Sequence, residues 1–299
     1  MANYRVLWLE NALGQTYALT DESRTFTFLN TPTGFGFTRS YSVEKVGNLE
    51  ILTSEEFSTG NVTGELVFYN PQGNDYIYQD YQDFIDFIKY KHLRLYYQTP
   101  NLLASDSFYT NILITSIQKG EIDEVGMLKA SITFHKFTPW FNATDTVIKL
   151  DNTLTSDGKH YNLVRPYHYS STGFDGATII NQGTNEVGFI FTISGDTITN
   201  PYFALSQNGE VYGVCRINGT YDYVMINSIE DAEQIYLELN GTVIASPEQK
   251  QDFTVRDGAA YLTWCKLKTG TSTIRVSGGN IDTFAGEVTV AFKNSYVSV

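Results

Sequence analysis

The stretch that decides the fold is YQDYQDFIDFIKYKH, residues 78–92. Its apolar and aromatic side chains recur at intervals of three and four, which places them on one stripe of an α-helix. Acidic residues come early and basic residues late, as the helix macrodipole favours, and Asn74 or Asp75 is the predicted N-cap. The predicted core-facing residues are Tyr78, Tyr81, Phe84, Ile85 and Ile88.

Strands are predicted on both sides of this helix. After His92, apolar residues alternate with Arg94 and Tyr96, and this period of two is typical of a strand. A single helix packed on strands predicts an α+β front domain. Further strands are expected at Tyr4–Leu9, Thr16–Leu19, Thr25–Leu29, Leu49–Thr53, Val62–Tyr69, Phe108–Ile117 and Met127–Phe134.

Two connections in the front half draw attention. TPTGFGF, Thr31–Phe37, has two glycines, but no helix begins after it and it lacks the Lys and Ser/Thr of a phosphate-binding loop. The polar segment Ser54–Gly60 is predicted to be a long, exposed connection between two strands.

Composition indicates a sheet-dominated protein of two domains. The chain has 299 residues, and 14% of them are aromatic. The formal net charge of −13 argues against a surface that binds duplex nucleic acid, because such binding depends on basic groups that neutralise phosphates.

Neither a targeting segment nor a membrane span is predicted. The N-terminus MANYRVLWLENALGQ lacks a basic region followed by an apolar core, and no apolar run approaches about eighteen residues. We therefore expect synthesis in a cytoplasm. Cys215 and Cys265 are too few for a disulfide framework or a thiolate zinc site, which leaves one bridge or two buried thiols open.

The back half predicts a β-sandwich. Three Asn-Gly pairs, Asn208-Gly209, Asn218-Gly219 and Asn240-Gly241, favour type I′ hairpins between short strands. Strands are expected at Ile190–Ser194, Thr263–Leu267, Thr273–Ser277 and Val288–Phe292. The boundary is placed near residues 142–152, which gives domains 1–145 and 146–299, and the last strand, residues 287–299, either completes the sandwich or returns to the front domain.

No pattern for catalysis or metal binding stands out. The histidines at 92, 135, 160 and 168 have no metal-ligand spacing, although Asp157, His160 and His168 lie on one segment. No nucleophile elbow is present, and the adjacent pairs Glu55-Glu56 and Glu230-Asp231 lie in polar connections with no burial to raise one pKa above the other, as a glycosidase acid and base require. We expect no enzyme activity and no cofactor. Sugar-stacking aromatics remain an alternative to core packing at Tyr202, Tyr212, Tyr221, Tyr223 and Trp264.

The order of motifs is similar to that of a known family. In the front half, TPTGFGF is followed by GNLEIL at Gly47, GELVFYN at Gly64, YQDFIDFI, LRLYYQ, the run ITSIQKGEIDEVGMLKASITF, and TPW ending at Trp140. This order resembles the N-terminal domain of the siphophage distal tail proteins, the baseplate hub family. The back half, with NPYFAL at Asn200, YVMINS at Tyr223 and the run at Gly270, is similar to that family's galectin-like C-terminal domain.

The resemblance implies a structural protein of the virion tail tip or baseplate. It implies a homohexameric ring formed by the front domains, which joins the major tail or tail tube protein to the tail-associated lysin or spike and carries receptor-binding proteins. No sequence-specific nucleic-acid partner and no membrane is implied. Candidate ring contacts are Glu55, Glu56, Phe57, Ser58 and Thr59, and Pro139 and Trp140 form the motif that ends the front domain.

Two other classes of protein compete with the hub. A carbohydrate-binding β-sandwich that recognises host cell-wall glycan would need a concave face with an aromatic ring and convergent polar groups. A cell-wall hydrolase would need a paired carboxylate or a His-rich metal site, for which the sequence gives no pattern.

Overall fold

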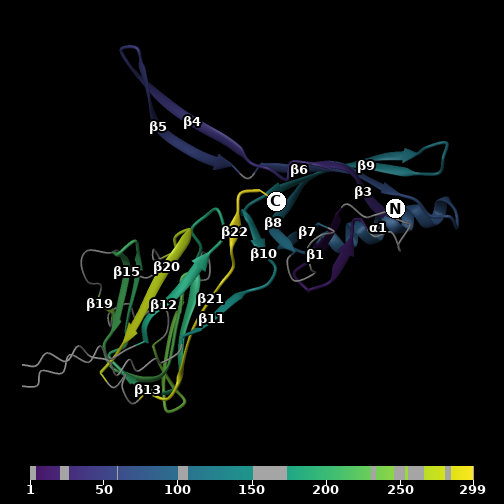
Figure 1. Cartoon of the computed structure of the whole chain (residues 1–299). Helices are drawn as coiled ribbons and strands as arrows, with labels where there is room; N and C mark the ends of the chain where they lie inside the picture. The colour runs from purple at the N-terminus through teal and green to yellow at the C-terminus, as the bar shows by residue number, and fades with distance from the viewer. Residues whose placement is uncertain are drawn as a thin grey trace, which may run out of the picture. The chain divides into compact units, whose positions relative to one another are not determined.

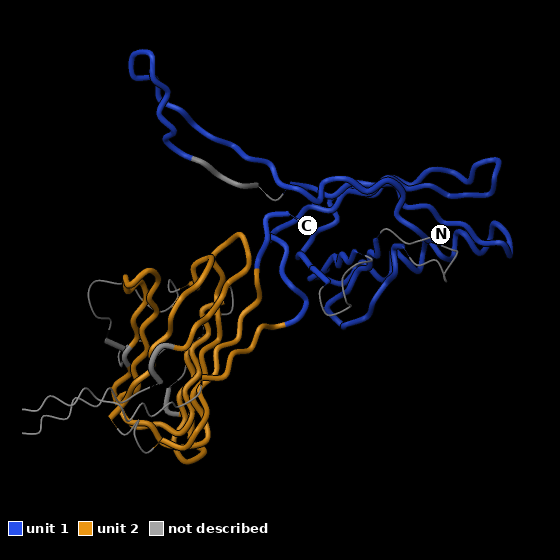
Figure 2. Tube along the Cα trace, in the orientation of Figure 1, with its two compact units in different colours: residues 1–144, 295–299 blue, residues 145–294 orange. Residues whose placement is uncertain are grey.

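The computed structural model describes residues 5–20, 27–58, 60–99, 107–150, 174–229, 234–245, 253–254, 266–279 and 284–298. The chain divides into two compact units, shown in different colours in Figure 2. Unit 1 comprises residues 1–144 and 295–299, and unit 2 comprises residues 145–294. The end of the chain is thus shared: β21 (Glu287–Phe292) belongs to unit 2, whereas β22 (Ser295–Tyr296) belongs to unit 1.

Unit 1 is built on a nine-stranded sheet whose pairings are all antiparallel (Figure 1). A bridge between Thr20 and Phe28, with a 2.7 Å hydrogen bond from Leu29 N to Leu19 O, connects the two ends of this sheet, so that it closes on itself. Closure leaves no long unpaired edge at these strands. The order is β2 (Thr16–Ala18), β1 (Val6–Glu10), β7 (Leu93–Gln98), β8 (Phe108–Ile122), β9 (Leu128–Lys136), β6 (Asn61–Phe68) and β3 (Thr27–Thr33), with β10 (Trp140–Asn142) paired to β8 and β22.

The helix α1 spans Asn74–Ile88, four residues earlier at each end than the quoted stretch. The prediction of a helix is confirmed, but the predicted side-chain cap is wrong, because Gly73 is the N-cap and no side chain caps it. Asn70 explains the early start: its Oδ1 accepts from Gln72 N at 3.0 Å and its carbonyl accepts from Gly73 N at 3.2 Å, which turns the chain directly into the helix.

The apolar face of α1 is centred on Ile77 and Phe84, which are 1% and 0% exposed. Ile77 takes the place predicted for Tyr78, whose side chain is 39% exposed. The Phe84 ring lies 5.1 Å from that of Tyr17 on β2 and 6.0 Å from that of Phe68 on β6. The helix therefore packs on two strands that are distant in sequence and joins their side chains in one core.

Between β3 and β6 the chain forms a separate two-stranded hairpin, β4 (Thr38–Val46) and β5 (Leu49–Ser58). It projects away from the nine-stranded sheet (Figures 1 and 2). The prediction that Ser54–Gly60 is a polar connection is wrong, because the backbone pairs with β4 as far as Ser58, opposite Thr38. The alternation of Tyr41 and Val43 with polar residues was the available signal for the missed strand β4.

Unit 2 is a sandwich of two antiparallel sheets, as expected for the back half. Phe203 of the five-stranded sheet packs against Phe191 and Phe189 of the six-stranded sheet, at 4.9 and 6.1 Å between ring centroids. The six-stranded order is β11 (Thr146–Leu150), β21, β13 (Phe189–Thr199), β16 (Thr220–Asn227), β17 (Gln234–Leu239) and β18 (Thr242–Ala245). The five-stranded order is β12 (Phe174–Asn181), β20 (Gly270–Ser277), β14 (Tyr202–Gln207), β15 (Glu210–Ile217) and β19 (Phe253–Thr254).

Two of the three predicted Asn-Gly hairpins are confirmed. Asn208-Gly209 joins β14 to β15 and Asn240-Gly241 joins β17 to β18, with positive φ at both residues of each pair. The hairpin predicted at Asn218-Gly219 is wrong, because this turn carries the chain from one sheet to the other. A 2.8 Å hydrogen bond from Gly219 N to Asn200 Oδ1 fixes the crossing.

Candidate functional site

The predicted ring contacts fall on the half of the β4–β5 pairing that lies nearest the sheet, opposite Thr38–Tyr41. Glu55, Glu56, Phe57 and Ser58 form backbone pairs with β4, and their side chains lie outside the described part of the structure. Thr59 also lies outside the described residues. The segment is therefore a paired strand, and the described side chains that could form a contact surface are those of the rest of the hairpin.

The described part of the hairpin exposes apolar side chains at its far end. We call this set the hairpin tip: Val43, Val46, Leu49, Ile51 and Leu52, which are 44–70% exposed. Val43 pairs with Leu52 on one face, whereas Val46 pairs with Leu49 on the other. A hairpin with apolar residues on both faces cannot shield them by itself, so the tip has the character of an interaction surface.

Lys136 holds the base of the hairpin. The alternation of β9 points Leu128, Ala130, Ile132 and Phe134 into the core and gives Lys136 the next inward position, where it is 1% exposed. Its ammonium donates to Gly34 O at 2.9 Å and to Gly36 O at 3.0 Å, both just before β4. Burial lowers the pKa of Lys136 to about 8.

The predicted end motif lies at the same place. Trp140 is fully buried, donates from Nε1 to Phe35 O at 3.2 Å and lies 5.7 Å from the Lys136 ammonium, while Pro139 is half-buried. TPTGFGF is thus a structural loop whose carbonyls accept from Lys136 and Trp140. Sequence reasoning missed Lys136, although a lysine in phase with four apolar residues of a strand was the signal.

Gly34 fits this loop for a steric reason. Its φ is +92°, and a Cβ built there would lie 1.9 Å from the backbone oxygen of Asn61. Only glycine satisfies both conditions without movement of β6.

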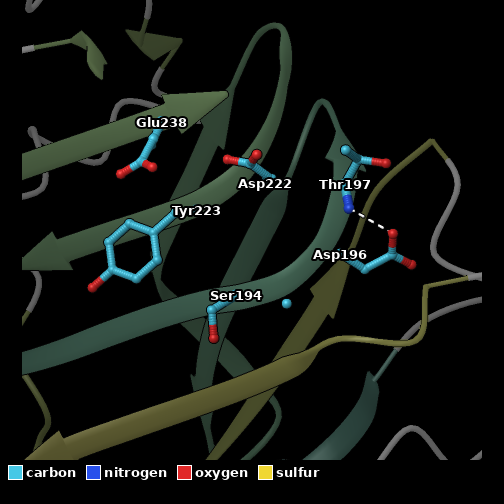
Figure 3. A pocket seen from close by; sticks show the side chains of 7 residues that line it. Ser194, Asp196, Thr197, Asp222, Tyr223 and Glu238 are labelled. Atoms are coloured by element: carbon cyan, nitrogen blue, oxygen red, sulfur yellow. Dashed lines mark hydrogen bonds between the residues drawn. The ribbon is translucent and has the colours of Figure 1, made fainter. Parts of the chain in front are cut away.

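Unit 2 contains a shallow pocket of about 420 Å³ (Figure 3). The side chains of Ser194, Tyr223 and Glu238 come from neighbouring strands, since Ser194 pairs with Tyr223 and Tyr223 with Glu238. The pocket is lined by Ser194, Gly195, Asp196, Thr197, Asp222, Tyr223 and Glu238.

Two carboxylates in this pocket are held by backbone amides. Asp196 accepts from Ala285 N at 2.9 Å and Thr197 N at 2.7 Å, and these hydrogen bonds lower its pKa. Asp222 Oδ2 accepts from Asn240 N at 2.6 Å, whereas its buried Oδ1 has no hydrogen-bond partner within the described structure. The carboxylate and hydroxyl oxygens that line the pocket are hydrogen-bond acceptors, and Asp222 Oδ1 is buried behind them.

The other candidate residues that the structure describes are not brought together. His92 is exposed after α1, and His135 lies on β9 with Nδ1 2.8 Å from Asn61 Oδ1. Asp157, His160, His168, Glu230, Asp231, Trp264 and Cys265 lie outside the described residues, and Cys215 is buried. Within the described ranges, no group of three His, Cys, Asp or Glu side chains could hold a metal ion, and no helix is long and apolar enough to cross a membrane.

Comparison with solved structures places the fold among phage baseplate proteins. The chain is similar to a chain of the phage P2 baseplate in its activated conformation with Ca (TM-score 0.58, 15% identity, 99% of each chain covered). It is also similar to a chain of the same baseplate with Sr (TM-score 0.59, 15% identity, 99% of this chain and 100% of that chain).

A third similar structure is the Dit protein of SPP1, described as a paradigm of the hub adsorption apparatus in phages that infect Gram-positive bacteria. It matches with a TM-score of 0.62 and 11% identity over 97% of this chain and 98% of that chain. At these identities the likeness shows a shared fold over both units. A search of curated proteins finds no match.

The family comparison concerns unit 1. The family model of the distal tail protein N-terminal domain matches residues 6–137, from the first strand of the nine-stranded sheet to the end of β9. The matched range includes α1, the β4–β5 hairpin and Lys136. Residues 6–137 of this chain are thus similar to the N-terminal domain of the distal tail proteins.

Proposed function

We propose that this protein is a structural component of a phage tail tip, where six copies form a hub ring through unit 1. The match of residues 6–137 to the distal tail protein N-terminal domain carries this proposal. The hub would join the tail tube to a lysin or spike protein and anchor receptor-binding proteins. The chain would be made in the host cytoplasm, act in the virion, and need neither catalysis nor a cofactor.

The hairpin supports a ring because it is an extension with exposed apolar residues. Strands of nine and ten residues reach about 30 Å from the sheet at ~3.3 Å per residue. A contact made by an extension of one copy on a different surface of the next is head-to-tail, and such contacts close into rings when the rotation permits. We therefore place the ring contact at the hairpin, including the predicted segment Glu55–Thr59.

The mass in solution tests this proposal. One chain is 33.6 kDa, so six would total about 202 kDa by light scattering. The double variant Leu49→Asp/Ile51→Asp should lower the mass to that of one chain, because two charges would have to be desolvated in the contact. Val211→Asp is the matched control, since Val211 of unit 2 is 59% exposed and apolar. A wild-type chain that stays at one-chain mass at all concentrations would contradict the ring.

The partners and the location are tested on particles. Quantitative mass spectrometry of purified virions should find this chain in a multiple of six copies. Mild dissociation of tails should release it together with tube, lysin or receptor-binding proteins. Recovery from the soluble host fraction alone, with none in particles, would contradict the structural role.

A second candidate function, saccharide binding, is favoured by the unit 2 pocket. The pocket combines the Tyr223 ring with hydroxyl and carboxylate acceptors, the groups that recognise the apolar and hydroxylated faces of a sugar. Titration of the chain with glucose, galactose, rhamnose and N-acetylglucosamine, followed by NMR, tests it. Binding that Tyr223→Ala removes and Tyr202→Ala keeps would support this function, and a wild-type chain that binds none of the four would dismiss it.

A further inference from the structure

A row of four aromatic side chains crosses the outer face of the unit 1 sheet. We call the set Trp8, Tyr96, Tyr109 and Phe141 the aromatic stripe; it crosses β1, β7, β8 and β10. Successive ring centroids are 4.9, 5.5 and 5.7 Å apart, and Trp8 and Tyr96 are stacked at 9°. The backbone registers match, because each residue pairs directly with the next across the sheet.

The stripe lies on the side of the sheet opposite the core. Sequence neighbours of the stripe residues, Leu7, Leu9, Leu95 and Thr110, are 0% exposed, so the alternating side chains point the other way. All four stripe residues are half-buried. The core of unit 1 therefore does not account for this row of rings, which has the composition of an interface.

Charged groups fix the stripe in place. Arg94 Nη1 donates to Glu10 Oε1 at 3.1 Å, Tyr96 Oη donates to Glu10 Oε2 at 3.0 Å, and the Arg94 guanidinium lies 5.2 Å from the centre of the Tyr109 ring. Trp, Tyr and Arg are the residue types that dominate binding energy at protein interfaces, and pre-ordered side chains lose little entropy on binding.

The hairpin tip complements this surface. It offers aliphatic side chains where the stripe offers rings, and it carries one close ion pair, Lys45 with Glu50 at 3.6 Å. The stripe has one as well, Arg94 with Glu10 at 3.1 Å. When the two surfaces meet, Lys45 can face Glu10 while Glu50 faces Arg94, so each charge of one surface lies opposite a charge of the other sign.

We infer that the aromatic stripe is the docking surface for the hairpin tip of a neighbouring copy of this chain. The inference rests on the proposed ring and names both sides of its contact. The hairpin points away from its own sheet (Figure 1), so that its tip reaches another copy. Donor and acceptor surfaces differ, and the contact is therefore the head-to-tail type that a ring requires.

Cross-linking between copies tests this contact without replacing any aromatic residue of the stripe or any apolar residue of the hairpin tip. The chain Asn48→Cys/Asn111→Cys places one thiol in the hairpin turn and the other on β8, one pleat from Tyr109 on the same face. A short bis-maleimide should convert it into a ladder of covalent multimers up to six chains on a denaturing gel. The matched control, Asn48→Cys/Asn208→Cys, has its second thiol in a unit 2 turn, away from the stripe, so it should give no ladder. Both variants keep the two native cysteines, so a ladder caused by these would appear in both.

The outcomes separate the contact from the ring. A ladder from the test pair alone supports the inference. Rings of about 202 kDa without a ladder would overturn it and leave the ring intact, with another protein or a glycan as the occupant of the stripe. One-chain mass for wild type and test pair alike would overturn both proposals, and a ladder that the control shares would mark random collision and overturn the inference.

Discussion

Replacement of Lys136 by Met tests how the hairpin base is held. Met keeps the length of the side chain but removes the ammonium that donates to Gly34 O and Gly36 O. Burial lowers the pKa of Lys136 to about 8, below the 10.5 of an exposed lysine. Between these two values the unfolded chain binds a proton that the folded chain does not, so stability contributed at this site rises with pH.

The size of the effect follows from the two pKa values. Raising the pH from about 7 to about 9 should increase the free energy of unfolding of wild-type unit 1, relative to Lys136→Met, by about 1 kcal/mol. At neutral pH the variant should also exchange backbone hydrogens faster at residues 34–37, because two buried carbonyls lose a donor.

Urea unfolding followed by tryptophan fluorescence measures this difference. A Trp264→Phe background leaves Trp8 and Trp140, both in unit 1, as the reporters. Lys129→Met is the matched control, since Lys129 lies on the same strand with a partly exposed side chain that pairs with Asp123 at 3.0 Å. The pKa of Lys129 is raised, chiefly by the hydrogen bond to Asp123. The stability that Lys129 contributes is therefore lost only at higher pH and should not change between pH 7 and 9. A difference between wild type and Lys136→Met that is flat from pH 7 to 9 would refute the reasoning.

Three further comparisons test unit 1 by the same unfolding assay. Phe84→Ala should lower the free energy of unfolding by about 3–5 kcal/mol because the ring is fully buried, whereas Tyr78→Ala should lower it by under about 1 kcal/mol. Equal losses for the two variants would contradict the assigned helix face. Gly34→Ala should cost more than about 2 kcal/mol, since it adds a backbone clash to a positive φ, and Gly14→Ala, with positive φ and open space, should cost about 1 kcal/mol. The pKa of Asp123 is lowered, first by the hydrogen bond from Met127 N. The stability that Asp123 contributes is therefore complete above its unfolded pKa and is lost as pH falls through its folded pKa. Asp123→Asn should flatten the fall in stability at acid pH, and an unchanged fall would count against this contribution.

The sequence was sufficient where one pattern governs a whole element. The three-and-four spacing predicted α1, and alternation predicted the strands that bury Leu66 and Phe134. It misplaced the helix start, because Gly73 and Asn70 determine the first turn through backbone geometry rather than through a capping side chain. Helix propensity favours Asn and Asp as N-caps, but it contains no information about the turn at Asn70 that precedes the helix and sets its first residue.

Long-range pairing set the other limits. All side chains of β4 and the described side chains of β5 are exposed, so the hairpin shows little apolar alternation beyond Tyr41 and Val43, and its polar half is predicted as a connection. Asn218-Gly219 has the composition of a hairpin, yet its flanking strands join different sheets. Lys136 contacts a loop about one hundred positions away, and the aromatic stripe pairs Trp8 with Tyr96, about ninety positions away. Only the folded register brings these residues together.

Electron microscopy of the purified chain tests the central claim most directly. We expect particles that average to a closed ring with six-fold symmetry. We also expect Leu49→Asp/Ile51→Asp to abolish these rings while unit 1 keeps its cooperative unfolding transition in urea. Single particles of one chain, open filaments, or rings that persist in this variant would contradict it.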